Sequence, residues 1–112
     1  MGWPAFQRTR AVLGRLARRR HAVGTIVVPS EPELLDLLVA AFHAELRRLG
    51  GEQIGRIGSA TVTERWRIGG VTLSLACDPG FGDRAQVSLS GRARLVDRIG
   101  KAVLQGLNRN RC

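Results

Sequence analysis

From Ser59 to Ser90, apolar and polar residues alternate with a period of two, in three segments separated by turn-forming residues. This period is typical of β-strands that bury one face. The segments span 59–68, 71–77 and 84–90; Gly69-Gly70 has the composition of a two-residue hairpin turn, and Asp-Pro-Gly-Phe-Gly-Asp at 78–83 that of a longer turn. The pattern predicts a three-stranded antiparallel meander with one apolar and one polar face.

Two helices are predicted to flank this meander. Residues 31–49 are apolar around much of a helix, which indicates burial on two sides, and Gly50-Gly51 ends the segment. Ser30, followed three residues later by Glu33, predicts a capping box. A second amphipathic helix is predicted over 92–107, with Ser90 as a candidate cap.

We therefore expect a single α+β domain over 24–108, with two layers and a three- to four-stranded antiparallel sheet that carries the helices on one face. The β-branched run 25–28, ended by Pro29, predicts a strand added at an edge. Residues 109–112 are expected to fray. The expected core consists of apolar side chains from the long helix, the meander and the last helix: Leu35, Leu38, Phe42, Leu46, Val62, Trp66, Leu73, Leu75, Val87, Leu89, Leu95, Ile99 and Val103.

The charge of the chain is distributed unevenly. The first 30 residues contain six arginines and no acidic residue, and the formal net charge is +9. We expect residues 1–23 to form a basic amphipathic arm, helical over 5–20. Such a charge favours nucleic acid, an acidic protein or an anionic membrane surface as partner. The arm has three interpretations: contact with nucleic-acid backbone, contact with a membrane surface, or cover for the apolar side of helix 31–49.

Three groups of arginines form the candidate binding site, because guanidinium groups bind phosphate and carboxylate bidentately. The first group is in the arm, the second on the polar face of the meander, and the third at the start of the last helix. In that order they are Arg8, Arg15, Arg18, Arg19 and Arg20; Arg65, Arg67 and Arg84; and Arg92, Arg94 and Arg98.

The predicted order of helix, three strands and helix over 31–107 is similar to that of double-stranded-RNA-binding domains. In that resemblance, Arg92, Arg94 and Arg98 fall where such domains place basic residues that contact phosphate. The Gly69-Gly70 turn is too short for the loop with which that family reaches a groove, and the lysine cluster is absent. The resemblance is one of topology, and topology carries no function.

No catalytic or metal-binding motif is present. Glu64 interrupts the apolar face of its strand, which predicts a bulge, a strand end or a buried carboxylate paired with arginine. His21 and His43 stand at no recognisable spacing from a nucleophile or metal ligand. The 78–83 turn lacks the ligand number of a calcium loop. We expect no enzyme activity, no metal and no cofactor.

The two cysteines, Cys77 and Cys112, cannot form a disulfide framework, and Cys77 lies within a strand pattern. A reduced, cytoplasmic compartment is expected, or an organelle if residues 1–23 are a presequence. No stretch is apolar enough to span a membrane.

Together these features predict a small, basic, non-enzymatic module that contacts nucleic-acid backbone. The alternative is a protein-interaction partner (an adaptor, a secretion-type chaperone or an immunity-like inhibitor) that acts through the apolar surface of helix 31–49, including as a homodimer.

Overall fold

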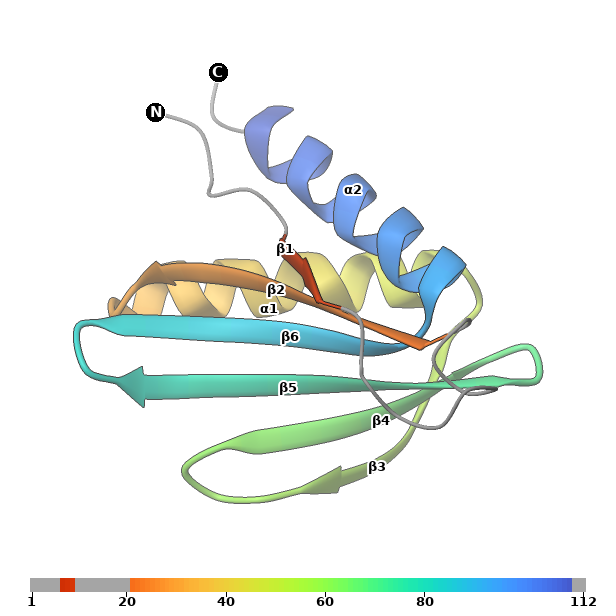
Figure 1. Ribbon diagram of the computed structural model, residues 1–112, viewed down its shortest axis with the longest axis horizontal. Helices are drawn as coiled ribbons and strands as arrows, with labels where there is room; N and C mark the ends of the chain where they lie inside the picture. The colour runs from red at the N-terminus through yellow and green to blue at the C-terminus, as the bar shows by residue number, and fades with distance from the viewer. Residues whose placement is uncertain (1–6, 10–20, 110–112) are drawn as a thin grey trace.

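The computed structural model describes residues 7–9 and 21–109, which form an antiparallel sheet and two helices (Figure 1). Along the chain the elements are β1 (Gln7–Thr9), β2 (His21–Pro29), α1 (Pro32–Arg48), β3 (Glu52–Ile57), β4 (Val62–Ile68), β5 (Val71–Phe81), β6 (Arg84–Arg92) and α2 (Ala93–Arg109). The sheet order is β1-β2-β6-β5-β4-β3, and every neighbouring pair is antiparallel. The α+β class is confirmed, and the described sheet has six strands rather than three or four.

Both helices cover the same part of the sheet. The α2 helix packs on β2 and β6, α1 packs on β2, β6 and β5, and the two helices contact each other. Figure 1 shows β3 and β4 on the far side of β5 from β6, and β4 still reaches the helix layer through Trp66, which contacts His43 and Arg47 of α1. One face of β2, β6 and β5 is therefore buried, β4 is covered at Trp66, and β3 extends beyond the helix layer.

The core lies between the helices and this face. Leu38, Phe42 and Leu46 of α1 are fully buried, as are Ile99 of α2 and Trp66 of β4, at 0 or 1% exposure. Spacing of three or four residues in the helix and of two in the strands produces these apolar faces, as the sequence predicts. Two residues of the expected core, Val62 and Leu95, are instead half-buried.

The start of α1 differs from the predicted capping box. The N-cap residue is Glu31, and no side chain caps the helix. The Ser30 hydroxyl instead donates to the Pro79 carbonyl at 3.2 Å, and the Ser30 amide donates to the Asp83 carbonyl at 2.9 Å. Ser30 therefore fastens the β2–α1 connection to the β5–β6 turn, and tertiary contacts replace the local cap.

Glycines shape two tight places in the chain. Gly50, with φ of 81°, ends α1 as predicted, and the amides of Gly50 and Gly51 donate to the carbonyls of Arg47 and Leu46. Gly91, with φ of 150°, lies against β5, where a Cβ atom would stand 2.3 Å from Cδ2 of Leu73. The end of β6 can therefore pack closely on β5 because residue 91 has no side chain.

Several predicted boundaries are corrected by the structure. The expected edge strand 25–28 is the nine-residue β2, which lies between β1 and β6. The hairpin β3–β4 replaces a strand from 59 to 68: β4 starts at Val62, and β3 was not predicted. Strand β5 extends to Phe81, and its irregular pairing between Asp78 and Phe81 lies where the turn was predicted. The last helix spans Ala93–Arg109, and Ser90 belongs to β6 rather than to a cap.

The N-terminal arm is described only in part. Gln7–Thr9 is a strand paired with Val23–Thr25, not a helix, and residues 21–23 belong to β2. The remainder of the predicted arm, 1–6 and 10–20, lies outside the described residues, as does the tail at 110–112.

Candidate functional site

The face of the sheet opposite the helices, here called the open face, is formed by alternate residues of each strand. The register places Arg65, Ser74, Ser90 and Val23 in one row across β4, β5, β6 and β2. A second row contains Thr63, Ala76, Ser88 and Thr25. Small side chains therefore cover the middle of the open face.

Hydroxyl groups dominate this central region. Thr25 Oγ1 and Ser88 Oγ lie 2.9 Å apart and share a hydrogen bond between β2 and β6. Ser74 and Ser90 stand opposite each other on β5 and β6, next to Arg65. Hydroxyls both donate and accept, so such a surface can bind phosphate or sugar oxygens.

Arginines gather at one end of the open face. Arg65 and Arg67 alternate on β4, and Arg92 ends β6. Since Ser90 is level with Ser74 and Arg65, Arg92 two residues later is level with Thr72 and Arg67. Strands β4 and β6 are two strand spacings apart, about 10 Å. We call Arg65, Arg67 and Arg92 the basic cluster.

One acidic residue adjoins the basic cluster. Glu52 of β3 pairs with Arg67 in the register, and Oε2 of Glu52 lies 3.7 Å from Nη2 of Arg67. Both side chains are more than half exposed. A surface ion pair of this kind contributes roughly 0–1 kcal/mol, so it does not prevent Arg67 from binding another anion.

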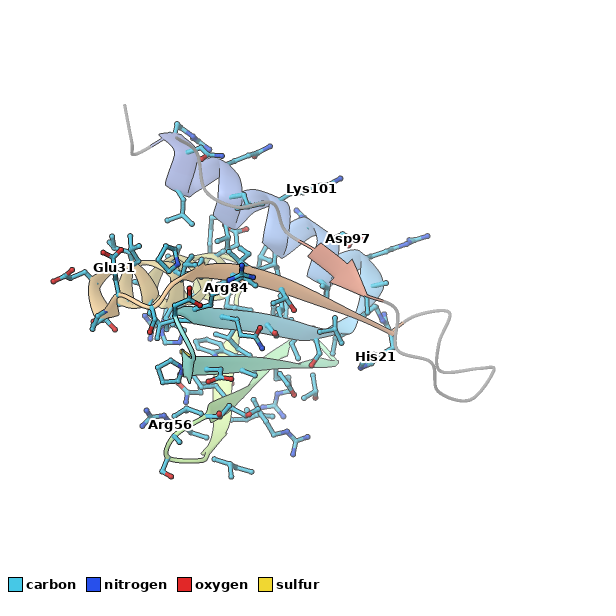
Figure 2. The ribbon with its side chains drawn as sticks, turned by 60° about the vertical axis from the view of Figure 1, so that its left-hand side comes forward. His21, Glu31, Arg56, Arg84, Asp97 and Lys101 are labelled. Atoms are coloured by element: carbon cyan, nitrogen blue, oxygen red, sulfur yellow. The ribbon has the colours of Figure 1, made fainter. Side chains whose placement is uncertain are left out.

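The other predicted site residues lie elsewhere. Arg84 begins β6, so it is at the opposite end of the open face from Arg92; Figure 2 shows Arg84 and His21, the partner of Arg92, at opposite ends of the β2–β6 pair. Arg94 and Arg98 are exposed on α2, in the helix layer. Arg8 belongs to β1, with its side chain outside the described part, and Arg15, Arg18, Arg19 and Arg20 are outside it altogether.

A second polar arrangement lies on the helix side of the sheet, and sequence analysis missed it. Oε1 of Glu64 accepts hydrogen bonds from Nε2 of His43 at 2.7 Å and from Nε1 of Trp66 at 2.9 Å. The imidazole also contacts the indole, with ring centroids 5.4 Å apart, and the guanidinium of Arg47 lies 5.8 Å from the indole centroid. These contacts connect α1 to β4, at the margin of the region where α1 packs on the sheet.

Glu64 is thus a part-buried carboxylate paired with histidine rather than with arginine. The break in alternation identifies Glu64 in the sequence, and His43 is half-buried on α1. Their partnership depends on where α1 crosses the sheet, for which the sequence has no local signal. Among the residues described, no group of three or more His, Cys, Asp or Glu side chains is arranged to hold a metal ion.

Comparison with protein-family models, with curated proteins and with solved structures gives no significant match to this chain. No helix within 7–9 or 21–109 is long and apolar enough to cross a membrane.

Proposed function

We propose that this protein is a non-enzymatic module that binds the backbone of nucleic acid through the open face. The supporting observation is the basic cluster: Arg65, Arg67 and Arg92 lie at one end of the open face, whose middle carries serine and threonine hydroxyls. Guanidinium groups bind phosphate bidentately, and hydroxyls complete contacts to phosphate and sugar oxygens. Such binding is governed by charge and is weakly selective for sequence.

The sequence carries further positive charge directly before β2. Residues 21–109 contain eleven basic and nine acidic residues, so they are close to neutral, whereas residues 1–20 contain six arginines and no acid. Arg18, Arg19 and Arg20 directly precede His21, which pairs with Arg92. We infer that the open face orients the ligand and that the arginines before His21 add affinity. A site of action in the cytoplasm fits this role.

The experiment is a fluorescence-anisotropy titration of a labelled 20-base-pair duplex and of the matching single strand, over a series of salt concentrations. The double variant Arg65→Gln, Arg67→Gln should weaken binding at least about tenfold and reduce the salt dependence by about two counterions. The matched control, Lys101→Gln with Arg109→Gln, removes the same charge at exposed positions of α2, in the helix layer, and should change affinity less than about twofold.

The outcomes separate the face from the arm. If Arg18→Gln, Arg19→Gln and Arg20→Gln abolish binding while the Arg65/Arg67 variant binds normally, the arm alone is the binding element and the open face is not the site. Equal losses in the Arg65/Arg67 and Lys101/Arg109 variants would show that the effect depends only on net charge. No binding of either nucleic acid at low salt would refute the proposal.

The alternative is a protein-interaction partner that uses the surface of α1. One observation favours it: Leu37 is 56% exposed on this helix. However, Leu35, Leu38, Phe42 and Leu46 are buried within the monomer, so the apolar surface left for a partner is small. A concentration-independent monomer mass in light scattering would argue against a homodimer built on this surface.

A further inference from the structure

A pocket of about 380 Å³ lies where α1 passes β4 on the helix side of the sheet. Helix α1 contributes Asp36, Val39 and His43 to its lining, and the strands contribute Arg56, Glu64 and Cys77. Val62, Leu35 and Ala40 complete apolar walls. Apolar walls with a few convergent polar groups, at this volume, are typical of sites for small ligands.

The carboxylate of Glu64 is held in a fixed orientation within this pocket. Its Oε1 atom accepts from both His43 and Trp66, and the side chain is only 13% exposed. Within the described residues, the hydrogen bonds of Glu64 involve Oε1 and leave Oε2 as the acceptor for a ligand. A preorganised acceptor of this kind does not have to be ordered when a ligand binds.

The charges around the pocket favour a cationic group near Glu64. Asp36 is exposed on α1, one helical turn before Ala40 and two before His43, and lines the same pocket as Glu64. The Cys77 thiol is consistent with this potential: burial raises its pKa, and so do the carboxylates of Glu64, Asp36 and Asp78. Arg56 stands opposite Glu64 in the β3–β4 register, with an exposed side chain, and Figure 2 shows it at the margin of the molecule.

We propose that this pocket binds a small organic ammonium ligand, a primary amine on a short aliphatic chain, with Glu64 Oε2 and Asp36 as acceptors. The apolar walls would contact the aliphatic chain. An ammonium group suits the site better than a guanidinium group, because Oε1 of Glu64 is already occupied and a bidentate fork needs both oxygens. Arg56 lines the same pocket and would compete with the ligand for these carboxylates. This site is separate from the open face and does not depend on nucleic-acid binding.

The test follows the indole N–H proton of Trp66 by NMR, since that proton is donated to Glu64 and reports on its carboxylate. Trp3→Phe removes the other indole of the chain. The probes are n-butylamine, 1-butanol and butyrate, which share a chain length and differ in charge. We expect a saturable shift of the Trp66 resonance with n-butylamine and no saturable shift with the other two.

Variants then identify the acceptors. Glu64→Gln keeps an oxygen for His43 and Trp66 but removes the charge, and should weaken n-butylamine binding at least about tenfold. Asp36→Asn should weaken n-butylamine binding about threefold, because the exposed Asp36 carboxylate attracts the ammonium group. Arg56→Gln should strengthen binding, because the exposed Arg56 guanidinium competes with the ammonium group for the carboxylates. Glu33→Gln is the matched control: it removes the same charge on α1 outside the pocket lining and should leave binding unchanged.

Several results would overturn the proposal. An unchanged Trp66 resonance with n-butylamine would show that the pocket does not take the ligand. Equal shifts with 1-butanol would show that the carboxylates play no part. A loss in Glu33→Gln as large as in Asp36→Asn would reduce the effect to overall charge. Asp36 and Arg56 are exposed, so their variants test the site even if Glu64→Gln does not fold.

Discussion

Nε2 of His43 lies 2.7 Å from Oε1 of Glu64, which joins the middle of α1 to β4, at the margin of the sheet region that α1 covers. The same oxygen accepts from the fully buried Trp66. Without this carboxylate, the indole N–H would be buried with no acceptor. The pair therefore stabilises the position of β4 relative to the helix layer.

Replacing Glu64 with alanine should lower the free energy of unfolding by about 1–3 kcal/mol, the cost of leaving a buried donor unsatisfied. Glu64→Gln keeps an acceptor oxygen and should cost less than half of that. Urea denaturation followed by Trp66 fluorescence, in the Trp3→Phe background, measures both. Equal stability of the alanine variant and the parent protein would show that the hydrogen bonds of Glu64 do not stabilise the fold.

Gly91→Ala should destabilise the fold, because the new Cβ would stand 2.3 Å from Cδ2 of Leu73 and 3.2 Å from the Thr72 carbonyl oxygen, at a φ of 150°. We expect a loss of at least about 2 kcal/mol from crowding and backbone strain. Gly70→Ala is the matched control, since a Cβ there meets nothing within 4 Å. Thermal unfolding of both variants by circular dichroism makes the comparison, and similar melting temperatures would contradict the close approach of β6 to β5.

Leu75→Asp should unfold the domain, because Leu75 is 1% exposed and a buried, unpaired carboxylate costs several kcal/mol, comparable to the total stability of a small domain. Thr72→Asp places the same charge on an exposed position of the same strand and should leave the fold intact. Far-ultraviolet circular dichroism distinguishes the two. Cooperative folding of Leu75→Asp would refute the assignment of Leu75 to the core.

Cys77 should react slowly with iodoacetamide. Burial, and then the carboxylates of Glu64, Asp36 and Asp78, raise the pKa of its thiol, so the nucleophilic thiolate is scarce at neutral pH. In a Cys112→Ser background, the alkylation rate should rise with pH. The midpoint of that rise should lie above the pKa of a free thiol, which is about 8.5. Folding favours the neutral form of the Cys77 thiol. The contribution of this thiol to stability is therefore complete when the pH is below its pKa in the unfolded chain. That contribution is lost as the pH rises through the folded pKa. An alkylation profile like that of free cysteine would contradict this environment.

The sequence predicts the parts of this fold that depend on local periodicity. The alternation around Leu73, Leu75 and Val87 identifies the central strands, and the spacing of Leu38, Phe42 and Leu46 identifies α1. Strand β3 has no such pattern, because neither of its faces is covered and its residues are exposed except for the half-buried Gly55. Ser30 has the local signature of a cap, but its hydroxyl finds a tertiary partner in the Pro79 carbonyl.

The same distinction between local sequence pattern and tertiary contact applies to the candidate sites. Strand alternation alone places Arg65 and Arg67 on the polar face. Arg92 is assigned to the same cluster only from the register of β6 with β5 and of β5 with β4. Arg84 belongs to the same face but to its other end, which composition cannot distinguish. The pairing of His43 with Glu64 depends on the crossing of a helix over a strand, and no local pattern encodes such a crossing.

The position of the β3–β4 hairpin at the margin of the helix layer has a consequence for the dynamics of the molecule. Backbone amides of this hairpin are protected by strand pairing, by the Glu64–His43 link and, on β4, by the buried Trp66, whereas β3 has no apolar cover and β2, β6 and β5 lie under the helices. Local opening should therefore begin at this hairpin, at a lower free energy than global unfolding. Native-state hydrogen exchange should divide the sheet into a fast-exchanging outer hairpin and a slow-exchanging centre. The loop at 58–61, at the tip of that outer hairpin, would then be the place where the chain accepts an insertion at least cost to the rest of the fold.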